Sequence, residues 1–112
     1  MSLQQTIKIV QNPILNLAKA MSALVKYVSL YVVVGDKTYN AYGAGQVFVN
    51  DTWVFYGTVD IDQDGVVNRI YANAYDKDNN LLTSIDVRFE YTITRGTYRV
   101  RVASRLIETE AR

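Results

Sequence analysis

The spacing of hydrophobic residues along this chain changes from every second position to every third or fourth, and then back again. Near the N-terminus, Ile7 and Ile9 alternate with Lys8, which is typical of a short strand. We place this strand within a terminal arm at residues 1–12. From residue 27 to about residue 107, strand-like segments alternate with turns, so most of the chain is predicted to be strand.

Between these regions the pattern is helical. Asn12 can cap unpaired amides, and Pro13 suits a first helical turn because its missing N–H needs no partner there. Apolar residues then recur at spacings of three and four, which places them on one face. They are Ile14, Leu17, Ala18, Met21, Leu24, Val25 and Val28. We predict a helix over residues 13–26.

The stretch Tyr27–Val34 is β-branched and aromatic, which favours a strand over a continuation of the helix. A helix that runs on to Val34 remains the alternative. After it, turn-forming residues recur at nearly even intervals. They are Gly35-Asp36, Asn50-Asp51, Asp62–Gly65, Asp76–Asn80 and Arg95-Gly96.

These turns separate six strands, at about 27–34, 37–49, 52–61, 66–75, 81–94 and 97–107. Gly43-Ala44-Gly45 lies inside the second strand and indicates a bulge or a bend there. Because tight turns join sequence neighbours, we predict an antiparallel meander over residues 27–109. The fold class is α+β and mostly β: a single domain over residues 1–112, with one N-terminal helix packed on a five- to six-stranded antiparallel meander. A sheet that curls toward a barrel is an alternative.

The last two strands make the most detailed prediction of pairing. With Arg95-Gly96 as a two-residue turn, apolar residues face each other on one side of the hairpin, and opposite charges meet on the other. The apolar pairs are Ile93 with Tyr98, Tyr91 with Val100 and Phe89 with Val102. The polar and charged pairs are Thr92 with Arg99, Glu90 with Arg101 and Asp86 with Arg105.

The middle strands are apolar on both sides. Trp53, Phe55 and Val59 share one side, while Val54 and Tyr56 occupy the other. Strands of this kind are covered on both faces. The helix can cover one face, and a curled sheet, the N-terminal strand or another copy of the chain can cover the second.

The amino-acid composition excludes several kinds of catalytic and metal-binding site. The chain has no cysteine and no histidine, which removes thiol chemistry, the commonest general base and the commonest transition-metal ligand. We therefore predict a protein that is not an enzyme and name no catalytic residue. Lys19 and Lys26 interrupt the apolar stretch after residue 13, and no secretory signal is evident, so we expect no membrane partner and a cytoplasmic or virion location by default.

One segment has the spacing of a calcium-binding loop. Asp60, Asp62, Asp64 and Asn68 lie at the ligand positions of a D-x-D-x-D-G motif, and these oxygens suit Ca²⁺. Tyr71 stands where that motif carries its bidentate glutamate, and the flanking segments are predicted strands. An aspartate-rich turn without metal is the ordinary alternative, so we predict no cofactor other than this calcium.

Arginines gather near the C-terminus, at Arg99, Arg101 and Arg105. Such a row could contact phosphates of a nucleic acid. Asp86 and Glu90 lie on the same predicted face, however, and the net charge is only +1. A solvated, salt-bridged face is therefore the preferred interpretation, and the sequence argues against a nucleic-acid partner.

The chain has nine tyrosines, an unusually large share for its length. Tyrosine is apolar in body and polar at its tip, and is common at interfaces. The candidate interface residues are Tyr31, Tyr42, Trp53, Tyr56, Tyr71 and Tyr75. We predict a non-catalytic structural subunit that associates with itself, as an oligomer, filament or virion component. The alternatives are a binding module with a Tyr/Trp-rich surface for a protein or ligand, and a weak calcium-stabilised domain.

Overall fold

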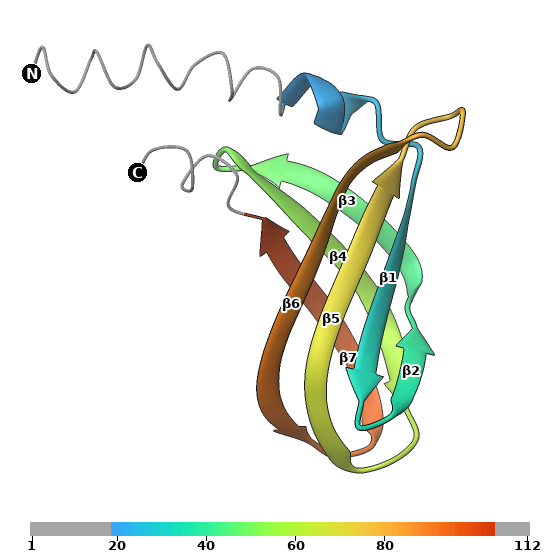
Figure 1. Cartoon of the computed structure of the whole chain (residues 1–112), viewed down its shortest axis with the longest axis vertical. Coiled ribbons are helices and arrows are strands. Elements are labelled where there is room, and N and C mark those ends of the chain that lie inside the picture. The colour runs from blue at the N-terminus through green and yellow to red at the C-terminus, as the bar shows by residue number, and fades with distance from the viewer. Residues whose placement is uncertain (1–18, 105–112) are drawn as a thin grey trace, which may run out of the picture.

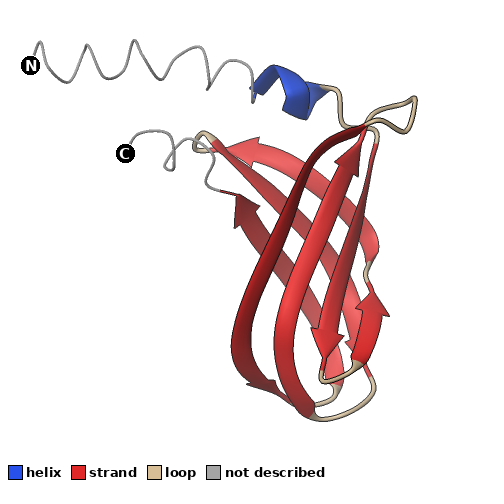
Figure 2. Ribbon diagram, viewed as in Figure 1, coloured by secondary structure: helices blue, strands red, loops and turns tan. Residues whose placement is uncertain are grey.

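The computed structural model describes residues 19–104, apart from the side chains of Phe89 and Ser104. It confirms the predicted class: antiparallel strands dominate, and a short helix precedes them (Figure 2). The strands are β1 (Tyr27–Val34), β2 (Lys37–Asn40), β3 (Tyr42–Val49), β4 (Thr52–Ile61), β5 (Gly65–Tyr75), β6 (Leu81–Ile93) and β7 (Gly96–Ser104).

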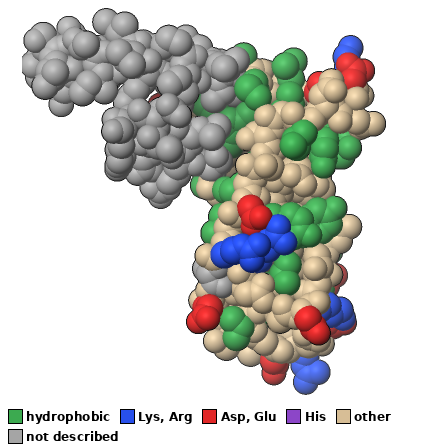
Figure 3. Space-filling view, viewed as in Figure 1, with side chains coloured by type: hydrophobic (Ala, Val, Ile, Leu, Met, Phe, Trp, Pro, Cys, Tyr) green, Lys and Arg blue, Asp and Glu red, His purple; other side chains and the backbone are tan. Residues whose placement is uncertain are grey.

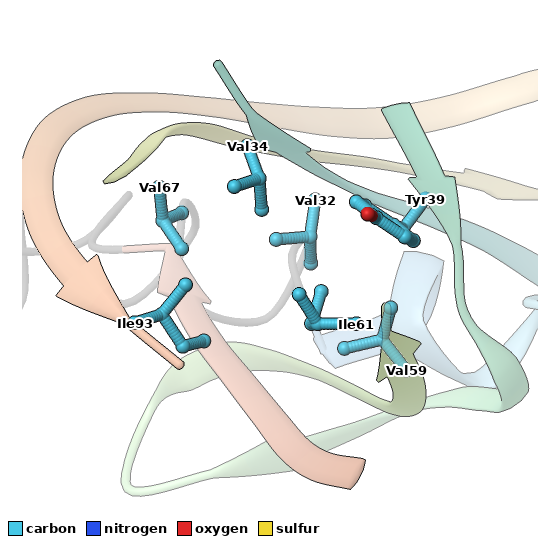
Figure 4. Close-up of a cluster of buried hydrophobic side chains, with 7 residues drawn as sticks. All are labelled: Val32, Val34, Tyr39, Val59, Ile61, Val67 and Ile93. Atoms are coloured by element: carbon cyan, nitrogen blue, oxygen red, sulfur yellow. The ribbon is translucent and has the colours of Figure 1, made fainter. Parts of the chain in front are cut away.

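The strands form two sheets that face each other (Figure 1). One sheet has the order β2-β1-β5-β6, and the other has the order β3-β4-β7. The inward side chains of both sheets make the core, which includes Leu30, Trp53 and Phe55 at one end. At the other end, valine, isoleucine and tyrosine side chains from both sheets converge (Figure 4).

Three of the predicted turns form hairpins, which join β1 to β2, β3 to β4 and β5 to β6. Gly35 has φ 63°, and Asn50 and Asp51 have φ 51° and 61°. Tight hairpins need such left-handed residues, so local turn chemistry explains these reversals. In the β5–β6 loop, the Asp76 carboxylate accepts hydrogen bonds from the amides of Asp78 and Asn80, at 2.8 and 2.9 Å.

The predicted strand 37–49 breaks at Ala41 and passes from one sheet to the other as β2 and β3. The predicted bulge is confirmed, because the register with β4 shifts between Tyr42 and Gly45. At this corner Gly57 packs tightly: a Cβ added to it would lie 3.0 Å from side-chain atoms of Ala41 and Leu30. The sheet therefore curls around one side of the core, but it does not close into a barrel.

The strand order departs from a simple meander at two connections. Residues between β4 and β5, and between β6 and β7, cross from one sheet to the other instead of reversing within a sheet. The two crossings touch, because the Arg95 amide donates to the Asp64 carboxylate at 2.9 Å. As a result β5 pairs with β1, far away in sequence.

The predicted hairpin of β6 and β7 is therefore wrong. In the described residues β6 pairs with β5 and β7 pairs with β4, so Val102 lies opposite Phe55 and not opposite Phe89. An alternating pattern fixes which residues face inward, but it fits any antiparallel neighbour, which explains the error. Ile93 and Val102 are buried as predicted, whereas Tyr91, expected in the core, is 61% exposed.

The ion pairs predicted for Asp86 and for Arg101 in that hairpin are also wrong. Asp86 forms its ion pair with Arg69 on β5, at 2.8 Å. Arg101 lies opposite Tyr56, not beside Glu90. Arg105 lies outside the described residues.

The described part of the helix covers residues 19–23 and ends before the predicted residue 26. It ends there because the chain joins the sheet: the Lys26 amide donates to the Tyr75 carbonyl at 2.7 Å. Residues 27–34 are β1, so the alternative of a longer helix is wrong. Met21 and Val25 pack on the core. The predicted N-terminal strand and the first turns of the helix lie outside the described residues.

Within residues 19–104, no helix is both long and apolar enough to cross a membrane. The outward sides of the two sheets are also uncovered by any other described element. On β4 the inward Trp53 and Phe55 are buried, while the outward Tyr56 is 39% exposed. The apolar outward residues that the sequence predicted to be covered are therefore open in a single described chain.

Candidate functional site

Four tyrosines lie on the outward side of the β2-β1-β5-β6 sheet, two on β1 and two on β5. We call this surface the tyrosine face. Its tyrosines are Tyr27, Tyr31, Tyr71 and Tyr75. Their inward neighbours along the strands, such as Leu30 and Ala72, are fully buried, which fixes the outward direction of the tyrosines.

The four rings form two stacked pairs. The ring centroids of Tyr27 and Tyr75 lie 4.7 Å apart, and those of Tyr31 and Tyr71 lie 4.8 Å apart. Each pair consists of residues directly opposite in the β1–β5 register. Because the tyrosines are four residues apart on both strands, one register aligns both pairs, with about 13 Å between them along the strands.

Arg69 contacts one of the four rings, that of Tyr71. Its guanidinium donates two hydrogen bonds to the Asp86 carboxylate, at 2.9 and 2.8 Å, and lies 4.1 Å from the centre of the Tyr71 ring. The hydrogen bonds lower the pKa of the Asp86 carboxyl and raise the pKa of Arg69, so both groups stay charged. This arrangement holds Tyr71 flat by a cation–π contact.

The face is accessible. Tyr27 is 46% exposed, and Leu81, opposite Tyr75 on β6, is 57% exposed, while Tyr31, Tyr71 and Tyr75 are half-buried. Figure 3 shows this side of the molecule, where groups of hydrophobic side chains lie beside a small group of basic and acidic ones. The face thus combines apolar rings with the Arg69–Asp86 ion pair and with the exposed Arg88, which lies opposite Arg69 on β6.

The remaining predicted interface residues are not on this face. Trp53 is 1% exposed and belongs to the core, so it is not a surface residue. Tyr42 and Tyr56 lie on the outward side of the other sheet. Tyr42 donates to Asp60 at 3.2 Å, and the Tyr56 ring lies over Gly45.

The predicted calcium ligands are not brought together around one centre. Asp60 accepts hydrogen bonds from Tyr42 and Thr97, and Asp64 accepts one from the Arg95 amide. The Asn68 amide donates to the Gly35 carbonyl at 2.8 Å, beside an irregularity in β5. Among the described residues, no group of three acidic side chains lies close enough to hold a metal ion.

Asp62 has a separate role at the end of the sandwich. Its carboxylate accepts hydrogen bonds from the Tyr39 hydroxyl and from the Lys37 ammonium, which lies 2.9 Å away. These bonds, that from Tyr39 foremost, lower the pKa of Asp62. The contact ties the β4–β5 crossing to β2, which is a structural task.

The predicted arginine row lies on the outward side of β7. Arg99 and Arg101 are exposed and line a shallow hollow of about 380 Å³, together with Val47, Tyr56 and Thr58. Gly43 lines the hollow and places no side chain over this part of the sheet, whereas the space over Gly45 is filled by the Tyr56 ring. Arg105, the third predicted residue, lies outside the described residues.

Sequence reasoning missed Tyr27, Leu81 and Arg69, which is the partner of Asp86. The equal spacing of Tyr27 with Tyr31 and of Tyr71 with Tyr75 was the available signal, because it allows two aligned pairs between the same two strands. Comparison with known proteins adds no further constraint: no family, no curated protein and no solved structure matches the chain.

Proposed function

We propose that this protein is a non-enzymatic subunit that associates with itself through the tyrosine face. The observation that supports this proposal is that two stacked tyrosine pairs, Tyr27 with Tyr75 and Tyr31 with Tyr71, lie on the outward side of one sheet. Tyrosines, with their large rigid rings, contribute contact area at low entropic cost and are enriched where proteins bind each other.

The charge on the face suits contact between identical surfaces. A two-fold interface brings each residue of one copy near the same patch of the other copy, so uncompensated charges would repel. Arg69 and Asp86 form an ion pair within one chain, and the exposed Arg88 and Glu90, two positions apart on β6, carry opposite charges. The tyrosine rings can therefore approach their counterparts with little like-charge repulsion at the centre of the contact.

The area of the tyrosine face indicates how strongly two copies should bind each other. Four strands about 4.8 Å apart and about nine residues long give roughly 500 Å² of flat area. A standard interface buries about 800 Å² per partner. We therefore expect weak association, with dissociation constants in the micromolar range or above.

Sedimentation velocity over a concentration series tests the proposal. The unmodified chain should shift from monomer to larger species as concentration rises, and the double variant Tyr31→Ser/Tyr71→Ser should shift at much higher concentration. Tyr42→Ser/Tyr56→Ser is the matched control, since it removes two exposed tyrosines from the other sheet. A monomer at every concentration, or an equal effect of both variants, would contradict the proposal.

A second candidate function is supported by the hollow on the other sheet. Arg99 and Arg101 lie side by side there, next to the Tyr56 ring, and guanidinium groups and an aromatic ring suit a phosphate joined to a flat base. Calorimetric titration with a nucleoside monophosphate tests it. Heat of binding that disappears in Arg99→Gln/Arg101→Gln would support this function, and absence of heat at low salt would exclude it.

A further inference from the structure

The two sheets are joined by a strand on one side only. On the opposite side β6 and β7 face each other without pairing, since β6 bonds to β5 and β7 bonds to β4. We call the gap between these two strand edges the seam. Both edges present backbone N–H and C=O groups without a ladder partner among the described strands.

The second core cluster lies beside the seam. A cleft of about 270 Å³ lies there. Most of its lining residues are apolar and come from both sheets, and Arg99 and Arg101 line it as well. The lining includes Val32, Val59, Val67, Ile70, Ile93 and Val100. Several of these side chains belong to the buried cluster in Figure 4, so the cleft borders the second core cluster. Tyr91, on the β6 side, is the most exposed of the large hydrophobic residues that the structure describes.

These features specify the chemistry of an occupant. An extended segment would satisfy the two strand edges by main-chain hydrogen bonds, which is the mechanism of strand addition. Its side chains on one side would enter the apolar cleft, and those on the other side would face solvent. The occupant must therefore be a short strand with alternating apolar and polar residues.

The chain carries such a segment outside the described residues. In Thr6–Val10, Ile7 and Ile9 lie on one side of an extended chain and Lys8 lies on the other. The C-terminal residues fit less well: they follow β7 directly, and Leu106 and Ile107 are adjacent, not alternating. Pro13 comes shortly after Val10 and cannot donate to a sheet ladder, which limits the strand to the arm.

We infer that the seam of one copy receives residues 6–10 of a second copy. Five residues span about 17 Å, against about 30 Å for the nine residues of β7, so the segment fits within the seam. Eighteen residues precede Lys19, a length that can extend to a neighbouring molecule. The inference rests on the proposed self-association but uses a different surface. A strand passed from each copy to the next is a head-to-tail contact, which builds rings or filaments.

A peptide added to the full chain tests the seam directly. The full-length variant Ile7→Asp/Ile9→Asp keeps every described residue but lacks the apolar side chains of the donor. A labelled peptide of residues Leu3–Asn12 should bind this variant and slow hydrogen exchange in β6 and β7, with no such effect in β3. The control peptide carries the same two aspartate substitutions and should not bind. Absence of protection in β6 and β7 would overturn the inference.

A cross-link decides whether the donor is a second copy. The chain has no cysteine, so Lys8→Cys/Glu90→Cys places one thiol on the donor and one on the exposed β6 edge. Covalent dimers and longer species on oxidation would support donation between copies. Cross-linking confined to monomers would overturn it.

The experiments can refute the proposal for the seam and the proposal for the tyrosine face independently of each other. If Tyr31→Ser/Tyr71→Ser leaves association unchanged but the peptide binds, the tyrosine face is wrong and the seam stands. If that variant dissociates the assembly and the peptide does not bind, the reverse holds.

Discussion

An engineered disulfide can test the strand order, because β7 pairs with β4 in the structure and with β6 in the hairpin that the sequence favoured. Thr58 and Arg99 lie directly opposite each other on β4 and β7. Opposite residues in an antiparallel pair have Cα atoms about 4.5–5.5 Å apart, within the range that a disulfide spans. Thr58→Cys/Arg99→Cys should therefore oxidise readily.

The expected stabilisation follows from the loop that the disulfide closes. A loop of roughly 40 residues corresponds to about 4 kcal/mol of unfolding free energy in the chain-entropy account, and engineered bonds often give less. With about 2 kcal/mol realised, the melting temperature should rise by roughly 8 °C or more.

Thermal unfolding followed by circular dichroism, with and without reductant, measures this shift. The matched control is Glu90→Cys/Arg101→Cys, which joins residues that the β6–β7 hairpin would place side by side. The control should oxidise slowly and stabilise less. If the control pair oxidises fast and stabilises the chain while the Thr58 pair does not, the strand order in the structure is refuted.

Three further predictions concern stability. Phe55→Ala empties a fully buried position and should lower the unfolding free energy by about 3–5 kcal/mol in a urea titration, whereas Arg101→Ala on the exposed face should cost less than about 1 kcal/mol; equal losses would mean that inward and outward faces are misassigned. Gly57→Ala should cost about 1–3 kcal/mol by overpacking the corner, and a neutral result in the same titration would show that the corner is loose. The pKa of the Asp62 carboxyl is lower in the folded chain than in the unfolded chain, so its ionised form stabilises the fold. The free energy of unfolding should therefore fall as the pH drops from roughly 5 to 2, because this carboxylate becomes protonated. Part of that acid slope should disappear in Asp62→Asn, and an unchanged slope would show that the lowered pKa of Asp62 contributes nothing.

Local features were predictable from the sequence because they depend on local chemistry. The left-handed residues at Gly35 and Asn50-Asp51 mark two hairpins, and alternation identifies Phe55 and Val102 as inward. The pairing of distant strands was not predictable in this way. A period of two fits any neighbour, so the sequence could not choose between β4 and β6 as the partner of β7.

The candidate site depended on that missing information. Tyr31 and Tyr71 were recognised as interface candidates, but their stacking requires β1 beside β5, a contact between segments about 40 residues apart. Trp53 was predicted to lie at an interface because large aromatic residues are common there. In the structure, Trp53 points inward from β4 and is buried. The aspartate motif was read from spacing alone, while in the fold Asp60 and Asp62 bond to different partners.

Hydroxyl-radical footprinting, read by mass spectrometry at low and high protein concentration, tests the proposed self-association most directly. The four tyrosines of the tyrosine face should be oxidised more slowly at high concentration, while Tyr42 and Tyr56 on the other sheet should be oxidised at an unchanged rate. Protection of Tyr42 and Tyr56 instead, or unchanged oxidation of the tyrosine face at concentrations where larger species sediment, would contradict association through this surface.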